Sequence, residues 1–364
     1  MTRRARVHRL PMASPDDMSA LSKAIAEGRI RPENIMAVLG KTEGNGNVND
    51  WTRALAARCL KDLIAWHAGD QLAATVCVVM SGGTEGALSP HMTVFEAREE
   101  GSPAEPGALA IGRAHTAALP PEELGRMRQV ADVAEGVARA LVNAGLDAAD
   151  VHFVQVKCPL LTSGRIAEAA SRGAGCVTTD TLKSMALSRA AAALGVAVAL
   201  GEIDRDAFAD EAIGHDLSLF STKASVSAGV ELLGHEVVVL GAGGNWCGPL
   251  RIDSAVMTDA LDVAPVRAAL ARLGLAADGQ LAPDQAGRLT AVLAKAEAGS
   301  TGSLRGRRHT MLVDSDVSST RHARAFLAGV LAGLVGHAEL YVSGGAEHQG
   351  PDGGGPVAII AEAA

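Results

Sequence analysis

The five-residue stretch SGGTE at 81–85 has two counterparts in the same chain, SAGVE at 227–231 and SGGAE at 343–347. All three follow the pattern Ser-[Gly/Ala]-Gly-x-Glu. Such a short pattern can recur by chance in a chain with 41 glycines, so other features must recur with it to carry weight. Self-similarity along a chain is the signature of an internal repeat, and it decides the fold where it is present.

A lysine and an arginine precede each of the three serines, in the same order. Each lysine ends a short apolar stretch, and the three are Lys41, Lys157 and Lys295. Each arginine precedes an alanine in a run of helical composition, and the three are Arg53, Arg189 and Arg324. The lysine and the serine of one copy lie 40, 70 or 48 residues apart, a difference that insertions in surface loops can produce. Each copy is therefore predicted to contribute one lysine, one arginine and one serine to a common centre.

The chain is expected to have an α+β fold of three homologous α/β repeat units, arranged with pseudo-threefold symmetry around a central active site. The predicted units are 1–103, 111–247 and 253–364. Three segments have the apolar composition of buried strands, namely 73–80, 236–244 and 338–342. Three others have helical periodicity or helix start and stop signals, namely 14–28, 120–145 and 319–336.

The composition argues against nucleic-acid and membrane partners. The chain has 364 residues, of which 48% are hydrophobic, so it can bury a sizeable core. Its net charge is −8 and its basic residues are scattered. It has neither an apolar run of 18 residues nor an apolar stretch behind its basic start. We therefore expect a cytoplasmic protein that binds neither nucleic acid nor a membrane.

Several familiar site motifs are missing or incomplete. The five cysteines form no C-x-x-C pair. Cys158 alone is kept as a residue of interest, because it is next to Lys157. The chain has no H-E-x-x-H motif for a zinc-activated water. The stretch VVLGAGGNW at 238–246 lacks the G-x-G-x-x-G spacing of a dinucleotide site. Ser227 lacks the G-x-S-x-G surroundings of an α/β-hydrolase nucleophile.

A serine paired with a lysine can perform acyl chemistry without histidine or aspartate. The serine hydroxyl needs a base, and a lysine serves as one when burial lowers its pKa towards neutrality. Glycine beside the serine lets the backbone approach a ligand, and its N–H can donate to a developing oxyanion. Arginine offers a planar fork of donors. Three such sets around an axis match a small flat ring with about three carbonyls.

These residues resemble the cyanuric acid hydrolase and barbiturase family of ring-opening amidohydrolases. The resemblance spans essentially the whole chain, and its motifs are the three serine stretches, GKTEGNG (40–46), VKCPLL (156–161), AKAEAGS (294–300) and SGGAEHQGPDGGGP (343–356). It implies three repeat units with the substrate at their junction, one Ser–Lys dyad and no catalytic cofactor. Among family members, cyanuric acid hydrolases are the most similar; they open cyanuric acid to carboxybiuret, which decarboxylates to biuret.

The resemblance also implies roles for individual residues. It makes Ser227 the nucleophile and Lys157 its base, with Lys41 and Lys295 as supporting lysines. The implied substrate-binding residues are Arg53, Ser81, Gly82, Arg189, Ala228, Arg324, Ser343 and Gly344. A structural divalent cation, Mg²⁺ or Ca²⁺, is implied at Glu297, Ala346, Gln349, Gly350, Pro351 and Gly354. The implied partners are a small planar cyclic imide and further copies of the chain, as a homo-oligomer, expected to be a tetramer.

The local sequence gives a separate reason to choose the middle pair. Lys157 lies among apolar neighbours with no acid beside it, so burial should lower its pKa. Lys41 and Lys295 each have a glutamate two residues later, Glu43 and Glu297, which would hold them charged. The glutamates that end the three serine stretches, Glu85, Glu231 and Glu347, are interpreted as structural acceptors of loop N–H groups.

Two other functions stay open from the sequence. A barbiturase would open barbituric acid, a ring that differs from cyanuric acid at one position, CH₂ in place of NH. A non-catalytic binding protein could use the same frame to hold a small ligand, although the Lys157 and Ser227 pair argues against it.

Overall fold

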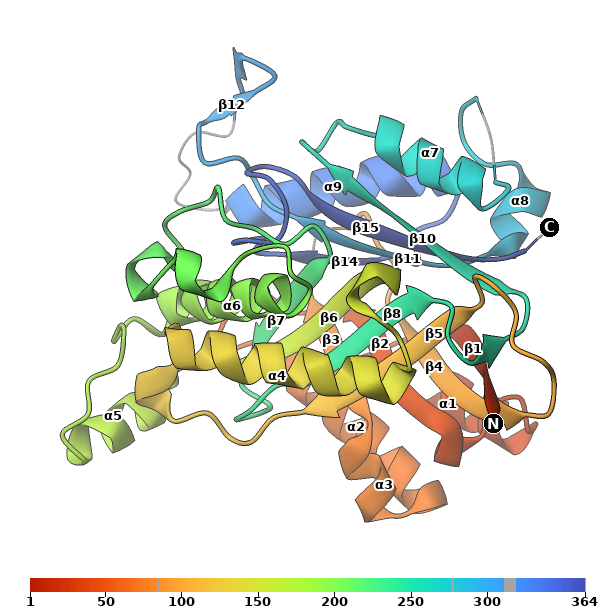
Figure 1. Ribbon diagram of the computed structural model, residues 1–364, viewed down its shortest axis with the longest axis horizontal. Coiled ribbons are helices and arrows are strands. Elements are labelled where there is room, and N and C mark those ends of the chain that lie inside the picture. The colour runs from red at the N-terminus through yellow and green to blue at the C-terminus, as the bar shows by residue number, and fades with distance from the viewer. Residues whose placement is uncertain (84–85, 276–277, 311–318, 364) are drawn as a thin grey trace.

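The computed structural model describes residues 1–83, 86–275, 278–310 and 319–363. These contain one five-stranded and two four-stranded sheets that share the same order of four strands, and a two-stranded sheet of β12 and β13. Figure 1 shows the three larger sheets gathered about the middle of the molecule with helices on their outer sides. The first sheet has the order β3-β2-β4-β1, and β9 extends it at β1. The second and third have the orders β7-β6-β8-β5 and β14-β11-β15-β10. In each sheet the first two strands of this order run parallel to each other, and the other two pairings within the four strands are antiparallel.

The strands and helices follow one another in a similar way in each part of the chain. The first part has β1 (Thr2–Pro11), α1 (Ser19–Ala26), β2 (Ile35–Thr42), α2 (Trp51–Ala68), α3 (Asp70–Thr75), β3 (Cys77–Gly82) and β4 (His91–Glu100). The second has β5 (Leu109–His115), α4 (Met127–Ala144), β6 (Val151–Pro159), α5 (Ser163–Ser171), α6 (Thr181–Ala199), β7 (Ala224–Gly229) and β8 (Glu236–Ala242). The third has β10 (Leu250–Met257), α7 (Ala264–Arg272), α8 (Pro283–Arg288), β11 (Leu289–Ala296), α9 (Ser319–Val335), β14 (Tyr341–Gly344) and β15 (Gly355–Glu362). The short strands are β9 (Trp246–Cys247), β12 (Ser303–Leu304) and β13 (Arg307–Arg308).

An irregularity recurs at the start of the strand that carries each lysine. The register shifts between Ile35 and Ala37 in β2, between Val151 and Phe153 in β6, and between Leu289 and Ala291 in β11. The lysine follows the first of these residues by six positions in every case. A bulge re-aims the side chains that follow it, so the same bulge gives the three lysines the same direction.

The core divides into a shared centre and separate outer layers. One cluster of buried residues takes Leu39, Val79 and Phe95 from the first sheet, residues from both faces of the second, and Leu293 and Tyr341 from the third. The opposite faces of the first and third sheets pack against their own helices. Because side chains alternate along a strand, Lys41 and Lys295 share the central face with Leu39 and Leu293.

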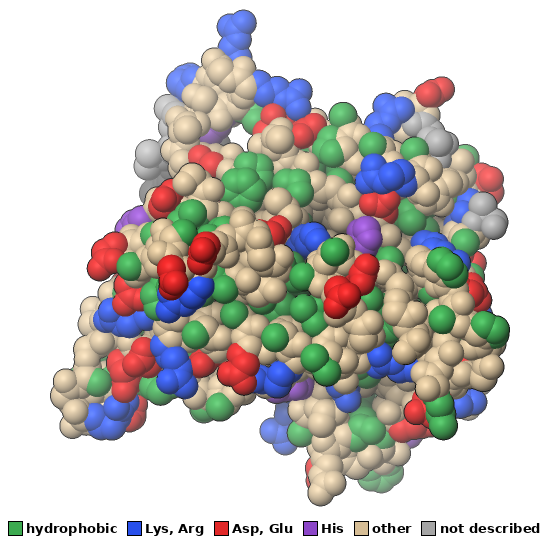
Figure 2. Space-filling model, viewed as in Figure 1, with side chains coloured by type: hydrophobic (Ala, Val, Ile, Leu, Met, Phe, Trp, Pro, Cys, Tyr) green, Lys and Arg blue, Asp and Glu red, His purple; other side chains and the backbone are tan. Residues whose placement is uncertain are grey.

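The helices and strands predicted from the sequence agree in part with those observed in the structure. The predicted strand 73–80 is wrong at its start, because 73–75 close helix α3 and the strand runs from Cys77 to Gly82. Helix α6 is long and apolar enough to cross a membrane, but 61% of its apolar window is buried within the protein. Acidic and basic side chains alternate over the face drawn in Figure 2. The observed fold is a mixed α/β fold, as expected.

Candidate active site

Each lysine lies directly beside its serine on neighbouring parallel strands. Lys41 is the register partner of Ser81 on β2 and β3, and Lys157 is that of Ser227 on β6 and β7. Lys295 is likewise the partner of Ser343 on β11 and β14. Residues paired in this way have side chains on the same face of the sheet. The lysine and serine of each unit therefore have the same relative placement, although their separations in sequence differ.

A cavity joins the predicted substrate-binding residues at the junction of the three sheets. All eight line it, with Ser227 beside them, and so do Gly46, Met80 and Met185, which the sequence did not single out. The eight are Arg53, Ser81, Gly82, Arg189, Ala228, Arg324, Ser343 and Gly344. They come from the three serine strands and from helices α2, α6 and α9.

The three lysines connect the sheets in a closed cycle. Lys41 Nζ donates to Val342 O at 3.4 Å, and Lys157 Nζ donates to Met80 O at 3.1 Å. Lys295 Nζ donates to Val226 O. Each acceptor is the residue just before the serine of another unit. The lysines are 3%, 0% and 1% exposed, so these contacts replace water around their amino groups.

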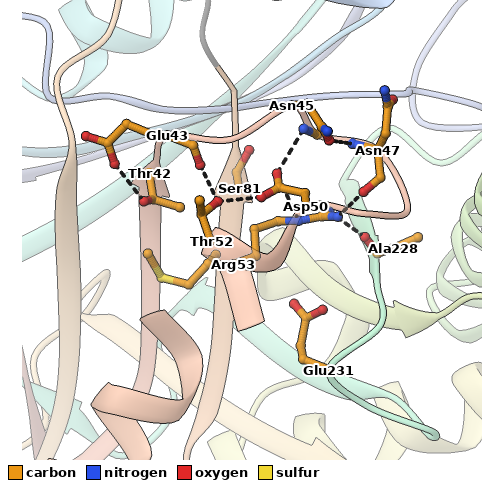
Figure 3. A network of polar contacts seen from close by, with 12 residues as sticks. Thr42, Glu43, Asn45, Asn47, Asp50, Thr52, Arg53, Ser81, Ala228 and Glu231 are labelled. Atoms are coloured by element: carbon orange, nitrogen blue, oxygen red, sulfur yellow. Dashed lines mark hydrogen bonds and ion pairs between the residues drawn. The ribbon is translucent and has the colours of Figure 1, made fainter. Parts of the chain in front are cut away.

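Arginine contacts run in the opposite sense around the cavity. Arg53 donates to Ala228 O at 2.8 Å and to Asn47 O at 2.6 Å, and Asp50 lies 3.4 Å from it (Figure 3). Arg189 makes a paired contact with Glu347, at 2.8 and 2.6 Å. Arg324 lies against Gly46, where an added Cβ would meet its guanidinium at 2.9 Å. Each guanidinium thus reaches from its own unit to the next.

Two of the glutamates that end the serine stretches, Glu231 and Glu347, accept a backbone N–H of their own stretch, as interpreted from sequence, and each also pairs with a cationic side chain. Glu231 lies 2.7 Å from Lys157 Nζ, and Glu347 holds Arg189. Glu85 falls outside the described residues. The second and third serine stretches therefore carry counter-ions of the site, a role that their sequence spacing alone does not reveal.

The predicted lowering of the Lys157 pKa by burial is confirmed, but the expectation that Glu297 would hold Lys295 charged is wrong. Burial lowers the pKa of Lys157, but Glu231, four residues beyond Ser227, opposes this and is absent from the local sequence around Lys157. Burial and the Arg189 guanidinium lower the pKa of Lys295 well below its ordinary value, although a glutamate lies two residues away in sequence. Proximity in sequence was therefore a poor guide to the charges around these lysines.

Two pairs compete for the role of nucleophile and base. Lys295 Nζ lies 3.0 Å from Ser343 Oγ, a direct hydrogen bond. Ser227 Oγ lies 3.5 Å from Tyr341 Oη, while Lys157 contacts Met80 O and Glu231. Burial raises the pKa of Tyr341, so this phenol stays neutral and can donate. Burial also raises the pKa of Cys158 to about 11, which leaves it a thiol and a poor nucleophile.

The residues implied for a cation gather beside the Arg189 and Glu347 pair. Burial and the Glu347 carboxylate raise the pKa of Glu297, as expected where two acids share a buried place. The Ala346 and Pro351 carbonyls accept one backbone bond each, from Gln349 N at 2.9 Å and Gly354 N at 2.8 Å. A carbonyl has two lone pairs, so both can still bind a cation. This oxygen set fits a hard divalent cation, which would relieve the repulsion between the two carboxylates.

Comparisons with known proteins place the whole chain in one family. Residues 6–362 match the family model described as amidohydrolase ring-opening protein. The cyanuric acid amidohydrolase of Bradyrhizobium sp. (strain ORS 375) is 60% identical, with 99% of this chain and 98% of that protein covered. The enzyme of the same name from Azorhizobium caulinodans is also 60% identical, with 98% of each covered.

Solved structures agree with the sequence comparison. The crystal structure of the cyanuric acid hydrolase from A. caulinodans superposes with a TM-score of 0.92 at 58% identity, over 100% of both chains. A second cyanuric acid hydrolase, described as an innovation by structural concatenation, gives a TM-score of 0.94 at 48% identity, also over 100% of both chains. The predicted resemblance is confirmed, and the chain belongs to the family of ring-opening amidohydrolases.

Proposed function

We propose that this chain is a cyanuric acid amidohydrolase that opens the ring with Ser227 as nucleophile and Lys157 as base. The observation that carries the proposal is the cavity lined by three serines from the three sheets and three arginines from helices α2, α6 and α9. A ring with three carbonyls presents three equivalent edges, and this cavity offers three equivalent sets of donors. Relatives at 60% identity that bear this activity support the choice of substrate.

The proposed reaction begins with proton transfer from Ser227 to Lys157. The serine oxygen attacks one ring carbonyl, and backbone N–H groups of the serine stretches with nearby guanidinium groups stabilise the oxyanion. The C–N bond then breaks as the ring nitrogen takes the proton that Lys157 received from Ser227, which opens the ring and leaves an acyl-enzyme. Water hydrolyses this ester to carboxybiuret, which loses CO₂ to give biuret. Each step uses only groups of the chain, the substrate and water.

The deciding experiment compares four purified proteins on cyanuric acid, with biuret and CO₂ as the measured products. Ser227→Ala and Lys157→Ala are expected to lose activity by about a thousandfold or more, because a nucleophile and its base act as a unit. Ser227→Ala should still bind the ring, as measured by calorimetry. Biuret formation by Ser227→Ala near the wild-type rate would refute the assignment of the nucleophile.

Ser343→Ala is the matched variant, because Ser343 makes the direct hydrogen bond to its lysine. If Ser343 only binds substrate, this variant should raise KM and retain measurable turnover. If instead Ser343→Ala is inactive while Ser227→Ala turns over, the Lys295 and Ser343 pair is the dyad.

Activity on barbituric acid, the second candidate substrate, distinguishes a barbiturase from a cyanuric acid hydrolase. Wild-type protein is expected to prefer cyanuric acid, because both relatives at 60% identity are cyanuric acid amidohydrolases. Turnover of barbituric acid alone would keep the dyad and change the substrate.

Three further properties belong to the same proposal. The lysine cycle and the opposite arginine cycle support a pseudo-threefold arrangement of the units about the cavity. We propose that Glu297 and the carbonyls of Ala346, Gln349, Gly350, Pro351 and Gly354 hold a structural Mg²⁺ or Ca²⁺. The homo-oligomeric state and the cytoplasmic location stay predictions, as do the unit boundaries.

A further inference from the structure

The contacts of Glu231 in the second unit differ from those of the corresponding glutamate in the third unit. Its carboxylate lies 2.7 Å from Lys157 Nζ, within its own unit. The corresponding Glu347 holds Arg189, a residue of another unit. Among the described residues, Lys295 Nζ has only uncharged acceptors, Val226 O, Ser343 Oγ and Gly344 O. Lys157 is therefore the one of these two lysines with a carboxylate at its amino group.

A second cavity, of about 140 Å³, lies against Lys157 and Glu231. This volume has room for several water molecules. Arg58 and Lys61 of helix α2 also line it, and their side chains are 76% and 34% exposed, so it reaches the surface there. Ser227 instead lines the substrate cavity. The proposed nucleophile and the proposed base thus face two different cavities.

We propose that Glu231 is the positioning residue of the base: its carboxylate holds the Lys157 amino group and carries the proton of Lys157 to the second cavity. This inference rests on the proposed role of Lys157 as base. The Lys157 ammonium gives a proton to the Glu231 carboxylate, which leaves a neutral amine and a carboxylic acid. The acid returns this proton to water in the second cavity. The amine lone pair then accepts the Ser227 hydroxyl proton as the serine oxygen attacks.

Burial opposes both charges, and so it brings the pKa values of the two partners closer together. Lys157 and Arg53 keep the pKa of Glu231 below its ordinary value, so Glu231 rests as a carboxylate and takes the proton only transiently. Arg53 is the other charge that acts on Lys157, and Cys158 beside it is a neutral thiol. The remaining charged groups on the cavity wall are Arg58, Lys61 and Glu236. Lys61 and Glu236 neutralise each other at 2.7 Å, and after burial Glu231 is the largest influence on the pKa of Lys157.

The test is the pH dependence of kcat/KM for cyanuric acid in wild type, Glu231→Gln and Glu231→Asp. Activity should rise with pH as Lys157 loses its proton. A carboxylate raises the pKa of a neighbouring lysine, so Glu231→Gln should move this rise to lower pH by about one unit or more. Its plateau kcat should fall about tenfold or more, since the amine loses its partner. KM should stay within about twofold, because Glu231 does not line the substrate cavity.

Glu231→Asp keeps the charge and should keep the wild-type pH dependence with a lower kcat. Glu347→Gln is the matched control, since this residue holds Arg189; it should raise KM and leave the pH dependence unmoved. The ionisation of the substrate is common to all variants and cancels in the comparison. An unmoved pH dependence in Glu231→Gln, or a rise in KM alone, would overturn the inference.

Two results keep this test separate from the proposed function. Activity in Lys157→Ala would overturn the dyad itself, whereas an inactive Lys157→Ala with an unmoved Glu231→Gln profile would overturn only the role of Glu231. Thermal unfolding checks that each variant folds. If Glu231→Gln does not fold, Glu231→Asp decides: wild-type kcat in that variant would contradict a positioning role.

Discussion

At the third position of SAGVE, Gly229 leaves the space in which Glu231 folds back towards Lys157. A Cβ added to Gly229 would meet Glu231 Oε2 at 2.0 Å and Cδ at 2.5 Å. These atoms end a flexible side chain, so the carboxylate can swing away without unfolding the strand. The glycine at the third position of this stretch thus serves the placement of the Glu231 carboxylate.

Gly229→Ala should therefore reproduce the kinetics of Glu231→Gln with both charges still in the chain. We expect the rise of kcat/KM to move to lower pH and kcat to fall about tenfold, because the separated carboxylate no longer supports the Lys157 ammonium. Gly175→Ala is the control, since an added Cβ there meets nothing within 4 Å. A Gly229→Ala enzyme with wild-type rates at every pH would show that the contact with Glu231 is dispensable.

At the scale of elements, small residues set how closely the helices pack. In α6, a Cβ on Gly195 would meet Val130 O of α4 at 2.6 Å and Val133 Cβ at 2.8 Å. In α9, Gly329 faces solvent and an added Cβ meets nothing within 4 Å. Many alanines and few aromatics in the chain are consistent with such close layers. The same residue type therefore has opposite consequences in two helices.

Gly195→Ala and Gly329→Ala should change the free energy of unfolding in opposite directions. The first overpacks the α4–α6 contact and should cost about 1–3 kcal/mol. The second replaces an exposed helical glycine and should stabilise by about 0.5–1 kcal/mol. Urea denaturation of both variants measures the difference. A stabilised Gly195→Ala protein would mean that the two helices are further apart than described.

At the scale of the whole molecule, the loop at 346–354 braces two units against each other. Gln349 Oε1 accepts from Val226 N at 2.6 Å, and its Nε2 donates to Gly345 O at 3.0 Å. Val226 precedes Ser227, so this loop supports the strand of the proposed nucleophile. A cation at Glu297 and the loop carbonyls would fix the brace in place.

Removal of divalent cations by a chelator is therefore expected to lower Tm by several degrees, and Mg²⁺ or Ca²⁺ should restore it. The reason is that a cation held only by the folded protein stabilises it by mass action. Glu297→Gln is the control and should no longer respond to chelator or cation. An identical Tm in wild type with and without chelator would contradict a structural cation at this site.

The sequence predicted some residues of the candidate site and missed others. The repeated serines, lysines and arginines predicted the family and the residues that line the cavity, since a repeated unit keeps its element order while its loops change length. Neither Met185 of the cavity wall nor Asp50 beside Arg53 was predicted. Each lies within four residues of a repeated arginine, but neither residue type recurs at the same position before the other two arginines.

The sequence by itself determined the triplication, the mixed α/β character and the ring-opening amidohydrolase family, because these follow from the order and spacing of residues along the chain. Only the tertiary structure decided which charges meet. Glu231 contacts Lys157 from 74 residues further along the chain, while Glu297, two residues from Lys295, leaves it to uncharged oxygens. The physical reason is that the pKa of a buried amine depends on charges within a few ångströms in space, and parallel strands bring those charges from distant segments.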